Sequence, residues 1–242
     1  MSTIDRSVEW DGCFNVRDLG GLPASNGRVT RRGALVRADK LSGLSGSGWS
    51  ALVKHGVRTI VDLRDPTECQ PDLAPRPSTL TTVSAPLEDQ TDTAFWEQWR
   101  PLSGTPLYYR PFLDRFPRRI AAALAAIAEA GPGGVVVHCA AGRDRTGMVT
   151  LVLLALLGVT SELIVADYLL SAEGLRRRSA HQGRADENTA AEALLRQAGT
   201  TAAGELASVL DALDPVAYLR AGGLRDAHLE ALRSRLLTSD LS

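Results

Sequence analysis

The sequence predicts an α/β fold in which helices flank a central, mostly parallel sheet and the helical C-terminal half of the chain forms a cap or lid. Short runs rich in β-branched residues alternate with helical patterns up to about residue 158, and the chain beyond that point is almost wholly helical. No linker long enough to separate two domains interrupts the 242 residues. We therefore expect a single domain, residues 1–242, in which residues 161–200 are a lid-like insertion.

Four short apolar runs have the composition and length of strands. They span residues 34–37, 58–63, 81–87 and 134–138. Helical patterns lie between them, at 48–55 and 116–130. Gly56 stops the first of these helices, and the run Gly131-Pro132-Gly133 stops the second with a glycine and a proline breaker. Strands and helices therefore alternate, as in an α/β fold.

The chain after the last predicted strand is expected to be helical almost to its end. A helix over 145–157 is closed by Gly158, and the next helix spans 162–171. Three further helices are expected at 187–198, 202–213 and 225–237. Two stretches, 65–77 and 87–106, are expected to be loops, and the second is long enough to carry a function.

The composition limits the partners and the location of the protein. The chain has 27 basic and 28 acidic residues and therefore almost no net charge. Its overall charge gives no electrostatic reason to propose nucleic acid or an anionic membrane as its main partner. Three cysteines without a Cys-x-x-Cys pair argue against a secreted disulfide framework and favour a reducing cytoplasm. Residues 1–12 lack the apolar core of a signal peptide, although export by another route stays open. No apolar run has the length of a transmembrane segment.

The pattern that carries chemistry is a predicted strand, then Cys139, five residues, and Arg145 at the start of a predicted helix. Backbone N–H groups and the helix dipole favour negative charge at a helix N-terminus. The Cys139 thiol should therefore ionise readily, and only the thiolate is a good nucleophile. The alternative is a buried core thiol with Arg145 as a surface charge. Two arginines and an aspartate within three residues make a poor core.

The same segment has the chemistry of a phosphate site. Its backbone N–H groups can form a nest around the oxygens of an anion, and small residues let the backbone approach closely. The residues of this nest are Ala140, Ala141, Gly142, Arg143, Asp144 and Arg145. The planar guanidinium of Arg145 can bind two phosphoryl oxygens. Thr146 can donate a hydrogen bond to the sulfur, and His138 can hold the loop through its ring nitrogens.

The segment HCAAGRDRTG, residues 138–147, resembles the signature loop of the protein tyrosine phosphatase superfamily. Its aspartate resembles that of a bacterial branch of tyrosine, dual-specificity and lipid phosphatases. Similarity extends to residues 15–21, 59–64 and 166–171. The resemblance implies a phosphocysteine at Cys139, phosphate binding by Arg145, and no cofactor or metal. Two features depart from the family: Arg143 stands where lysine is frequent, and no Trp-Pro-Asp loop is present.

Cleavage of a phosphate ester also needs a proton for the leaving oxygen. Asp144 is the first candidate for the donor, because the resemblance implies an aspartate within the loop. Asp89 is the second, since it follows a predicted strand where a mobile loop could close. Asp62 and Asp65 are the third, although charge pairing within the run Asp62-Leu63-Arg64-Asp65 or with Arg17 is the more expected role of Asp62.

Polar residues near the N-terminus are expected to support the signature loop through hydrogen bonds. These residues are Asn15, Arg17 and Asp18, with Asp62 as a further support. His55, His181 and His228 have no Cys or Glu at ligand spacing, so no metal site is expected.

These observations predict a cysteine-dependent phosphatase that hydrolyses phosphotyrosine in proteins or peptides, with dual specificity as an extension. The nearest alternative is a phosphoinositide phosphatase, for which Arg143 and the arginines at 176–178 would supply additional positive charge. A non-catalytic phosphate-binding module is disfavoured because Cys139 is present. Sulfur or arsenate chemistry would need a second, resolving cysteine near Cys139, and none is adjacent in the sequence.

Overall fold

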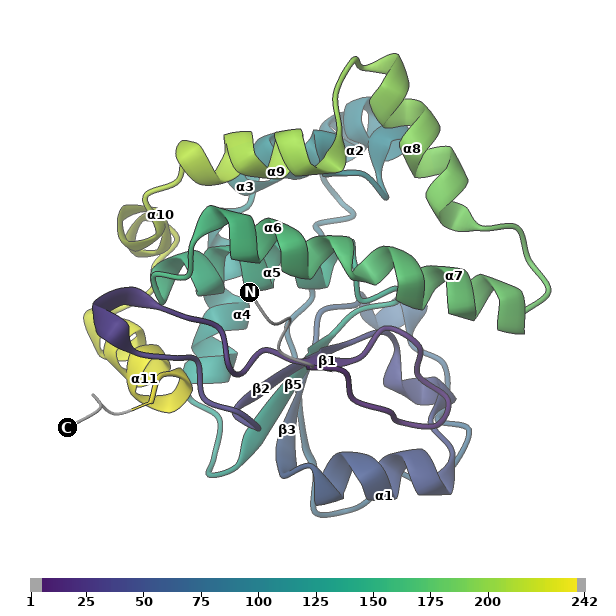
Figure 1. The fold of residues 1–242 in the computed structure, drawn as a ribbon, viewed down its shortest axis with the longest axis vertical. Coiled ribbons are helices and arrows are strands. Elements are labelled where there is room, and N and C mark those ends of the chain that lie inside the picture. Colours follow the sequence, from purple (N-terminus) through teal and green to yellow (C-terminus); the bar gives the residue numbers. More distant parts are fainter. Residues whose placement is uncertain (1–5, 239–242) are drawn as a thin grey trace.

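A computed structural model describes residues 6–238, and its centre is a five-stranded sheet in the order β1-β2-β5-β3-β4 (Figure 1). The strands are β1 (Arg17–Asp18), β2 (Leu35–Ala38), β3 (Val57–Asp62), β4 (Thr81–Ser84) and β5 (Gly134–His138). β1 runs antiparallel to β2, and all other neighbouring strands are parallel. This mostly parallel sheet, flanked by helices, confirms the predicted α/β fold.

β5 is the central strand, and the residues after it lie at the usual position of a binding site. It pairs with β2 on one side and β3 on the other, so that His138 lies opposite Ala38 and Asp62. All residues of β5 are buried. In open α/β sheets, ligands bind beyond the carboxyl ends of the strands. Cys139, which directly follows β5, lies at this edge of the sheet.

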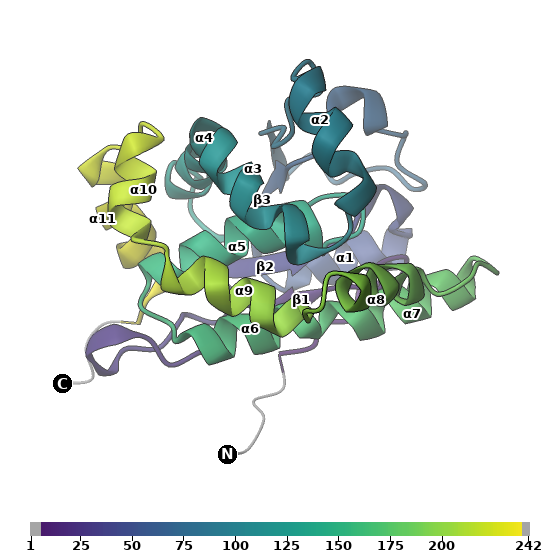
Figure 2. The same ribbon diagram turned by 90° about the horizontal axis from the view of Figure 1, so that it is seen from above.

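Helices cover both faces of the sheet (Figures 1 and 2). They are α1 (Gly46–Lys54), α2 (Thr93–Trp99), α3 (Tyr109–Arg115), α4 (Pro117–Ala128), α5 (Asp144–Leu156), α6 (Ser161–Leu169), α7 (Ser171–His181), α8 (Glu187–Gln197), α9 (Ala202–Asp211), α10 (Pro215–Ala221) and α11 (Asp226–Leu236). Successive residues of a strand point to opposite faces. Val136 accordingly packs in the core that contains Trp49 of α1, whereas Val135 and Val137 belong to the core that contains α4 and α5.

α5 begins immediately after the candidate loop and is buried on nearly all sides. Residues 146–154 are all buried, because the helix packs against β2, β5, α4, α6 and α10. A helix that is apolar around its whole circumference belongs inside a core. Its first turn is therefore held firmly against the end of β5.

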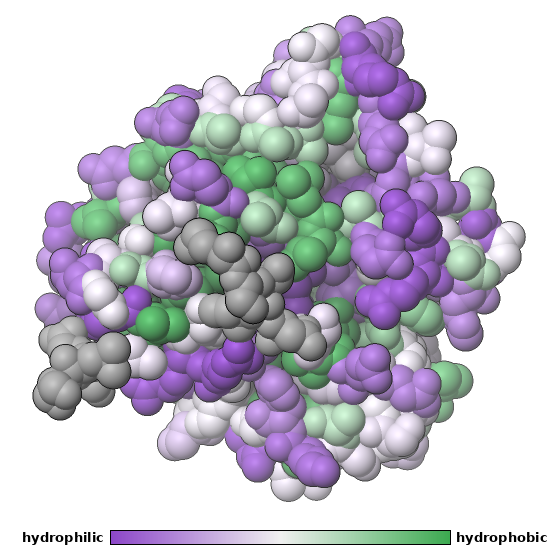
Figure 3. Space-filling view, viewed as in Figure 1, coloured by the Kyte–Doolittle hydropathy of each residue, from purple (hydrophilic) through white to green (hydrophobic). Residues whose placement is uncertain are grey.

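Residues 161–200, for which a lid-like role is expected, contain α6, α7 and α8. α6 packs on α9, while α7 and α8 pack on each other, and Arg178 of α7 binds the carbonyl of Ala140 in the loop after β5 (Figures 1 and 2). The surface over α7 is mainly hydrophilic, and hydrophobic side chains gather over α6 (Figure 3). Leu169 and Leu170, at the end of α6, are 45% and 51% exposed. Within residues 6–238, no helix has both the length and the apolar character needed to cross a bilayer.

The prediction of a continuous loop over 87–106 is wrong, because this stretch contains α2. The Asp92 side chain caps the helix by accepting a hydrogen bond from the Phe95 N–H at 3.1 Å, and Phe95 and Trp96 are buried. Such a short helix depends on tertiary packing and leaves little periodic signal in the sequence. The strand predicted at 81–87 ends earlier, at Ser84. The short elements β1, α3 and α10 are not predicted from the sequence.

Candidate active site

Cys139 lies at the bottom of the loop that connects β5 with α5. The residue is 2% exposed, and its Sγ accepts a hydrogen bond from the Gly142 N–H at 3.2 Å. Gly142 has a φ of +67°, and a Cβ at this position would lie 2.6 Å from the Ala38 carbonyl oxygen. Only glycine therefore fits this turn. The turn directs the Gly142 N–H group at the sulfur.

The carbonyl groups of the loop bind partners elsewhere in the chain. Ala140 O accepts from the Lys40 N–H (3.3 Å) and Arg178 Nη1 (2.9 Å), Ala141 O from Asn15 Nδ2 (2.9 Å), and Gly142 O from Arg37 Nη2 (2.7 Å). In a trans peptide, the C=O and the following N–H point in opposite directions. The N–H groups of the loop therefore face the space above the sulfur and form a nest that can bind an anion.

Behind the loop, Asp167 of α6 binds three arginines. Its carboxylate lies 2.8 Å from Arg6, 3.0 Å from Arg17 and 2.7 Å from Arg37, and its side chain is 1% exposed. Burial raises the pKa of Asp167, but Arg17 and Arg37 outweigh this effect and hold the pKa well below its usual value. Arg17 also donates to Asn15 Oδ1 at 2.8 Å. Asp167 is thus connected to the loop through Arg37 and through Arg17 and Asn15.

Arg145 lies in the first turn of α5, and two glutamates contact its guanidinium. Nη1 and Nη2 lie 2.5 and 2.8 Å from the two carboxylate oxygens of Glu68, which ends the 3₁₀ turn η3 (Pro66–Glu68). Oε2 of Glu88 lies 3.6 Å from Nη1. Burial lowers the pKa of Arg145, but the hydrogen bonds to Glu68 and the nearby negative charges raise it above the usual value. The guanidinium is therefore a permanent cation beside the loop.

A cavity of about 250 Å³ opens above Cys139. It brings together a sulfur, the N–H nest, a guanidinium and two carboxyl groups. The residues that line it include Ala140, Ala141, Asp144 and Arg145 from the loop and α5, and Glu88, Trp96, Arg100 and Tyr108 from other segments. Asp144 Oδ1 accepts hydrogen bonds from the Tyr109 and Tyr168 hydroxyls at 3.3 and 3.5 Å, and Oδ2 accepts one from Arg143 Nε at 3.2 Å. A thiol, backbone N–H groups that can bind an anion, and two carboxyl groups that can carry protons therefore line one cavity.

A model of the tyrosine phosphatase family matches residues 8–238. The chain belongs to this family. This membership confirms the resemblance predicted from the signature loop.

Three relatives illustrate how far the similarity extends. A protein of Cupriavidus necator that is named as a tyrosine-protein phosphatase is 34% identical, over 68% of this chain and 62% of that protein, so this chain spans less than two thirds of its length. The triple specificity protein phosphatase PtpB of Mycobacterium tuberculosis is 29% identical, over 95% of this chain and 98% of that protein. A tyrosine-protein phosphatase of Nostoc commune is 28% identical, over 88% of this chain and 78% of that protein.

Asp89, the second predicted candidate for the proton donor in this member of the tyrosine phosphatase family, does not line the cavity. Its carboxylate lies 3.0 Å from Arg119 Nη2 and accepts a hydrogen bond from the Thr91 hydroxyl at 2.6 Å. The neighbouring Glu88 lines the cavity instead. Neighbouring residues in an extended segment point to opposite sides. Of these two adjacent acidic residues, Glu88 therefore lines the cavity with Cys139, whereas Asp89 points away from it.

Asp62 and Asp65 also lie outside the lining of this cavity. Asp62 pairs with Arg64 through hydrogen bonds of 2.9 and 2.6 Å, and Asp65 caps η3 by accepting from the Thr67 N–H. His138 is buried, its Nδ1 is 3.3 Å from the Cys139 carbonyl oxygen, and its Nε2 is 3.5 Å from Asp62. Burial lowers the pKa of His138 to about 4. The neutral imidazole of His138 thus lies between the Cys139 carbonyl group and Asp62, where it can support the loop.

Two further predictions need correction. The Asp18 carboxylate accepts from the Gly20 and Gly33 N–H groups and contacts His55, so it holds the turn before β2 and does not touch the signature loop. The Thr146 hydroxyl is buried and has no hydrogen-bond partner within residues 6–238, so the predicted bond to the Cys139 sulfur is absent. Thr146 lies in the first turn of α5, which packs into the core.

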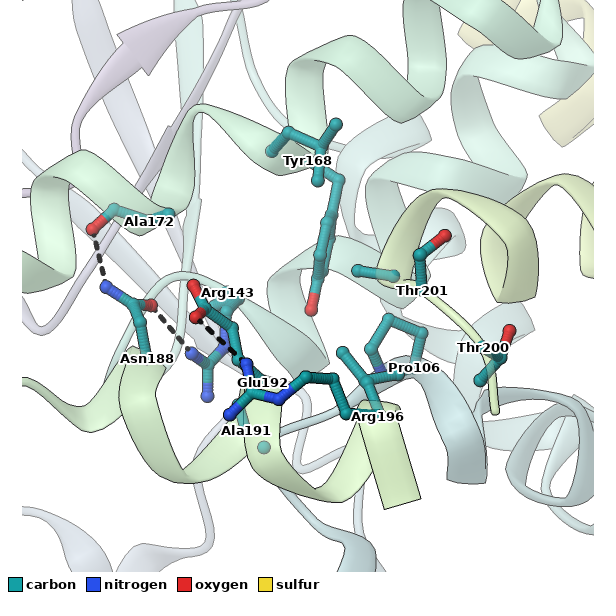
Figure 4. Close-up of a pocket in the computed structure, with 14 residues that line it drawn as sticks. Pro106, Arg143, Tyr168, Ala172, Asn188, Ala191, Glu192, Arg196, Thr200 and Thr201 are labelled. Carbon is teal, nitrogen blue, oxygen red and sulfur yellow. Dashed lines mark hydrogen bonds and ion pairs between the residues drawn. The ribbon is translucent and has the colours of Figure 1, made fainter. Parts of the chain in front are cut away.

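The side chain of Arg143 also lies elsewhere than predicted. Nη1 lies 3.3 Å from Asn188 Oδ1 of α8, and the side chain lines a second cavity of about 300 Å³ between α8 and the body of the protein (Figure 4). This cavity is separate from the lining around Cys139, although Gly104 borders both. The side chain of Arg143 therefore does not reach the anion nest, to which its backbone N–H belongs.

Several residues of the site escape prediction from the sequence. They are Arg37, Glu68, Glu88, Asp167 and Arg178. One signal was available: Arg37 and Asp167 are charged residues inside otherwise apolar segments, and a buried charge needs a partner. Glu68 and Glu88 carry no comparable signal, because glutamates in loops are usually solvent-exposed.

Proposed function

We propose that this chain hydrolyses phosphotyrosine through a phosphocysteine intermediate. In the first step, the Cys139 thiolate attacks phosphorus, the S–P bond forms and the ester P–O bond breaks, while Asp144 gives a proton to the leaving oxygen. In the second step, water attacks phosphorus, the S–P bond breaks, and thiolate and inorganic phosphate are released. The N–H nest and Arg145 stabilise the charge on the equatorial oxygens in both steps.

The placement of the Cys139 sulfur carries this proposal. It accepts an N–H hydrogen bond at the floor of a cavity that also contains the Arg145 guanidinium. Trp96 and Tyr108 line the same cavity and can contact a phenyl ring. A phenol, with a pKa of about 10, also leaves more easily than an alkoxide. Both points favour tyrosine esters, and slower turnover of phosphoserine and phosphothreonine would make the enzyme dual-specific.

A phosphoinositide substrate is less well supported by the charges around the site. The side chain of Arg143 lines a different cavity. Arg176 pairs with Glu173, and Arg178 lies 2.5 Å from Glu187. Of the arginines named from the sequence for an inositol phosphate, Arg143, Arg176 and Arg178 are therefore already paired, and Arg100 is a further cation that lines the Cys139 cavity. We also propose a cytoplasmic location, because a thiolate nucleophile must stay reduced.

The test replaces the nucleophile. Cys139→Ser should lower turnover of a phosphotyrosine peptide and of p-nitrophenyl phosphate by at least about 10³-fold, because a serine hydroxyl is far less ionised. The variant should still bind the peptide in calorimetry. The wild-type enzyme should be equally active with EDTA and faster on the peptide than on inositol lipids. Hydrolysis by the serine variant near the wild-type rate would contradict the cysteine mechanism.

A further inference from the structure

Glu88 brings a second carboxyl group to the cavity above Cys139. Its side chain is 16% exposed, and Oε2 lies 3.6 Å from Arg145 Nη1. Oε2 also accepts a hydrogen bond from Gln90 Nε2 at 3.0 Å. The carboxyl group is therefore next to the guanidinium that would hold the phosphoryl group.

The two carboxyl groups of the cavity differ in their hydrogen bonds. Both oxygens of Asp144 are engaged by donors from Tyr109, Tyr168 and Arg143. Within residues 6–238, the hydrogen bonds of Glu88 leave Oε1 without a protein donor. A water molecule in the cavity can donate to this oxygen.

Burial raises the pKa of Glu88, Glu68 and Asp144 raise it further, and Arg145 opposes the shift. A carboxylate with a raised pKa is a stronger base than an ordinary glutamate, and a base works best when its pKa approaches the operating pH. The environment of Glu88 thus improves its ability to accept a proton.

We propose that Glu88 takes the proton from the water that hydrolyses the phosphocysteine. This inference rests on the function proposed above. In the step it concerns, the water oxygen bonds to phosphorus and the S–P bond breaks with its electron pair returning to the Cys139 sulfur. The water proton passes to the Glu88 carboxylate and is later released to solvent, and Asp144 regains a proton from solvent before the next cycle. Asp144 and Glu88 then serve the two proton transfers of one cycle from different segments.

If Asp144 serves the first step and Glu88 the second, the steady-state kinetics of a Glu88 variant should show it. If only the second step is slowed, Glu88→Gln lowers kcat by about 100-fold, the usual effect of removing a general base. KM falls by the same factor, because the phosphocysteine accumulates. kcat/KM stays unchanged, since it reports only the steps up to formation of the phosphocysteine. A loss of structure alone would not lower KM and kcat together.

The experiment mixes p-nitrophenyl phosphate rapidly with wild type, Glu88→Gln, Glu88→Asp and the control Glu97→Gln, an exposed residue of α2 outside the cavity. Glu88→Gln should release about one nitrophenolate per enzyme in a burst and then turn over slowly, with phosphorylated protein visible by intact mass spectrometry. Glu88→Asp should recover part of kcat, and the control should match wild type.

Two results would overturn the inference. One is a Glu88→Gln variant with wild-type kcat, and the other is an equal loss of burst and steady-state rate without phosphorylated protein. Both leave the function proposed above in place as long as wild type turns over. A wild-type enzyme that forms neither product nor phosphocysteine would instead reject the proposed function itself.

Discussion

The floor and the wall of the Cys139 cavity are built in different ways. The floor is the loop from Cys139 to Arg145, and it is supported by Asp167, whose side chain is 1% exposed among arginines. The wall includes Glu88, which lines the cavity, and we count with it Glu68, which contacts Arg145 from outside the lining. Their side chains are 16% and 32% exposed, and they follow the ends of β4 and β3. Buried charge networks are costly to break, whereas exposed pairs contribute little stability. Changes in the buried charges that support the floor should therefore lower stability and activity together, and changes in the wall should lower activity alone.

The strongest test of this contrast is Asp167→Asn. The variant leaves three arginines without their carboxylate, and breaking a buried ion pair costs about 3–5 kcal/mol. Urea unfolding should show the loss in stability, and phosphatase assays should show reduced kcat because Arg37 no longer holds Gly142. Glu162→Gln, an exposed change on the same helix, should leave the unfolding midpoint unchanged. Equal stability of Asp167→Asn and wild type would remove the contrast.

The pH dependence of this comparison has a definite sign. Because the folded-state pKa of Asp167 lies below its usual value, its stabilising effect is present at neutral pH and is lost as the pH falls through the folded-state pKa. Asparagine does not titrate, so the stability difference between wild type and Asp167→Asn should shrink in acid. Urea midpoints measured between neutral and acidic pH would check this.

Asp144→Asn tests whether Asp144, at the start of α5, donates the proton to the leaving group or only helps to bind the substrate. A donor matters most for poor leaving groups, so turnover of phenyl phosphate should fall by about 100-fold and that of p-nitrophenyl phosphate much less. Unfolding midpoints should stay near wild type, because the amide keeps the shape of the side chain. An equal loss on both esters would show that Asp144 is not the proton donor.

Glu68→Gln is the mildest change, because it weakens one partner of Arg145 and leaves the loop intact. The carboxylate holds Nη1 and Nη2 together and so orients the guanidinium. Loss of one charge-assisted hydrogen bond should lower kcat/KM by roughly tenfold, about 1.4 kcal/mol. The affinity for vanadate should fall in parallel. Unchanged affinity would mean that Arg145 needs no partner on the wall.

The same contrast explains how much of the molecule is predictable from the sequence. The floor is contiguous, so the spacing of Cys139 and Arg145, with a strand before and a helix after, is visible in the chain. The wall joins segments that are distant in sequence, and no local pattern marks Glu68. Glu88 and Asp89 are neighbours in an extended segment, so their carboxyl groups point to opposite sides of the chain. For that reason Glu88 lines the cavity and Asp89 does not.

The partners of the loop carbonyls come from segments that are synthesised both before and after the loop. A nascent chain that ends after α5 already carries the whole signature loop, yet it lacks both Asp167 and Arg178. Asn15, Arg37 and Lys40 are present by then, but two of the loop's restraints have not left the ribosome. The loop therefore has its full set of hydrogen-bond partners only when α6 and α7 have packed against it.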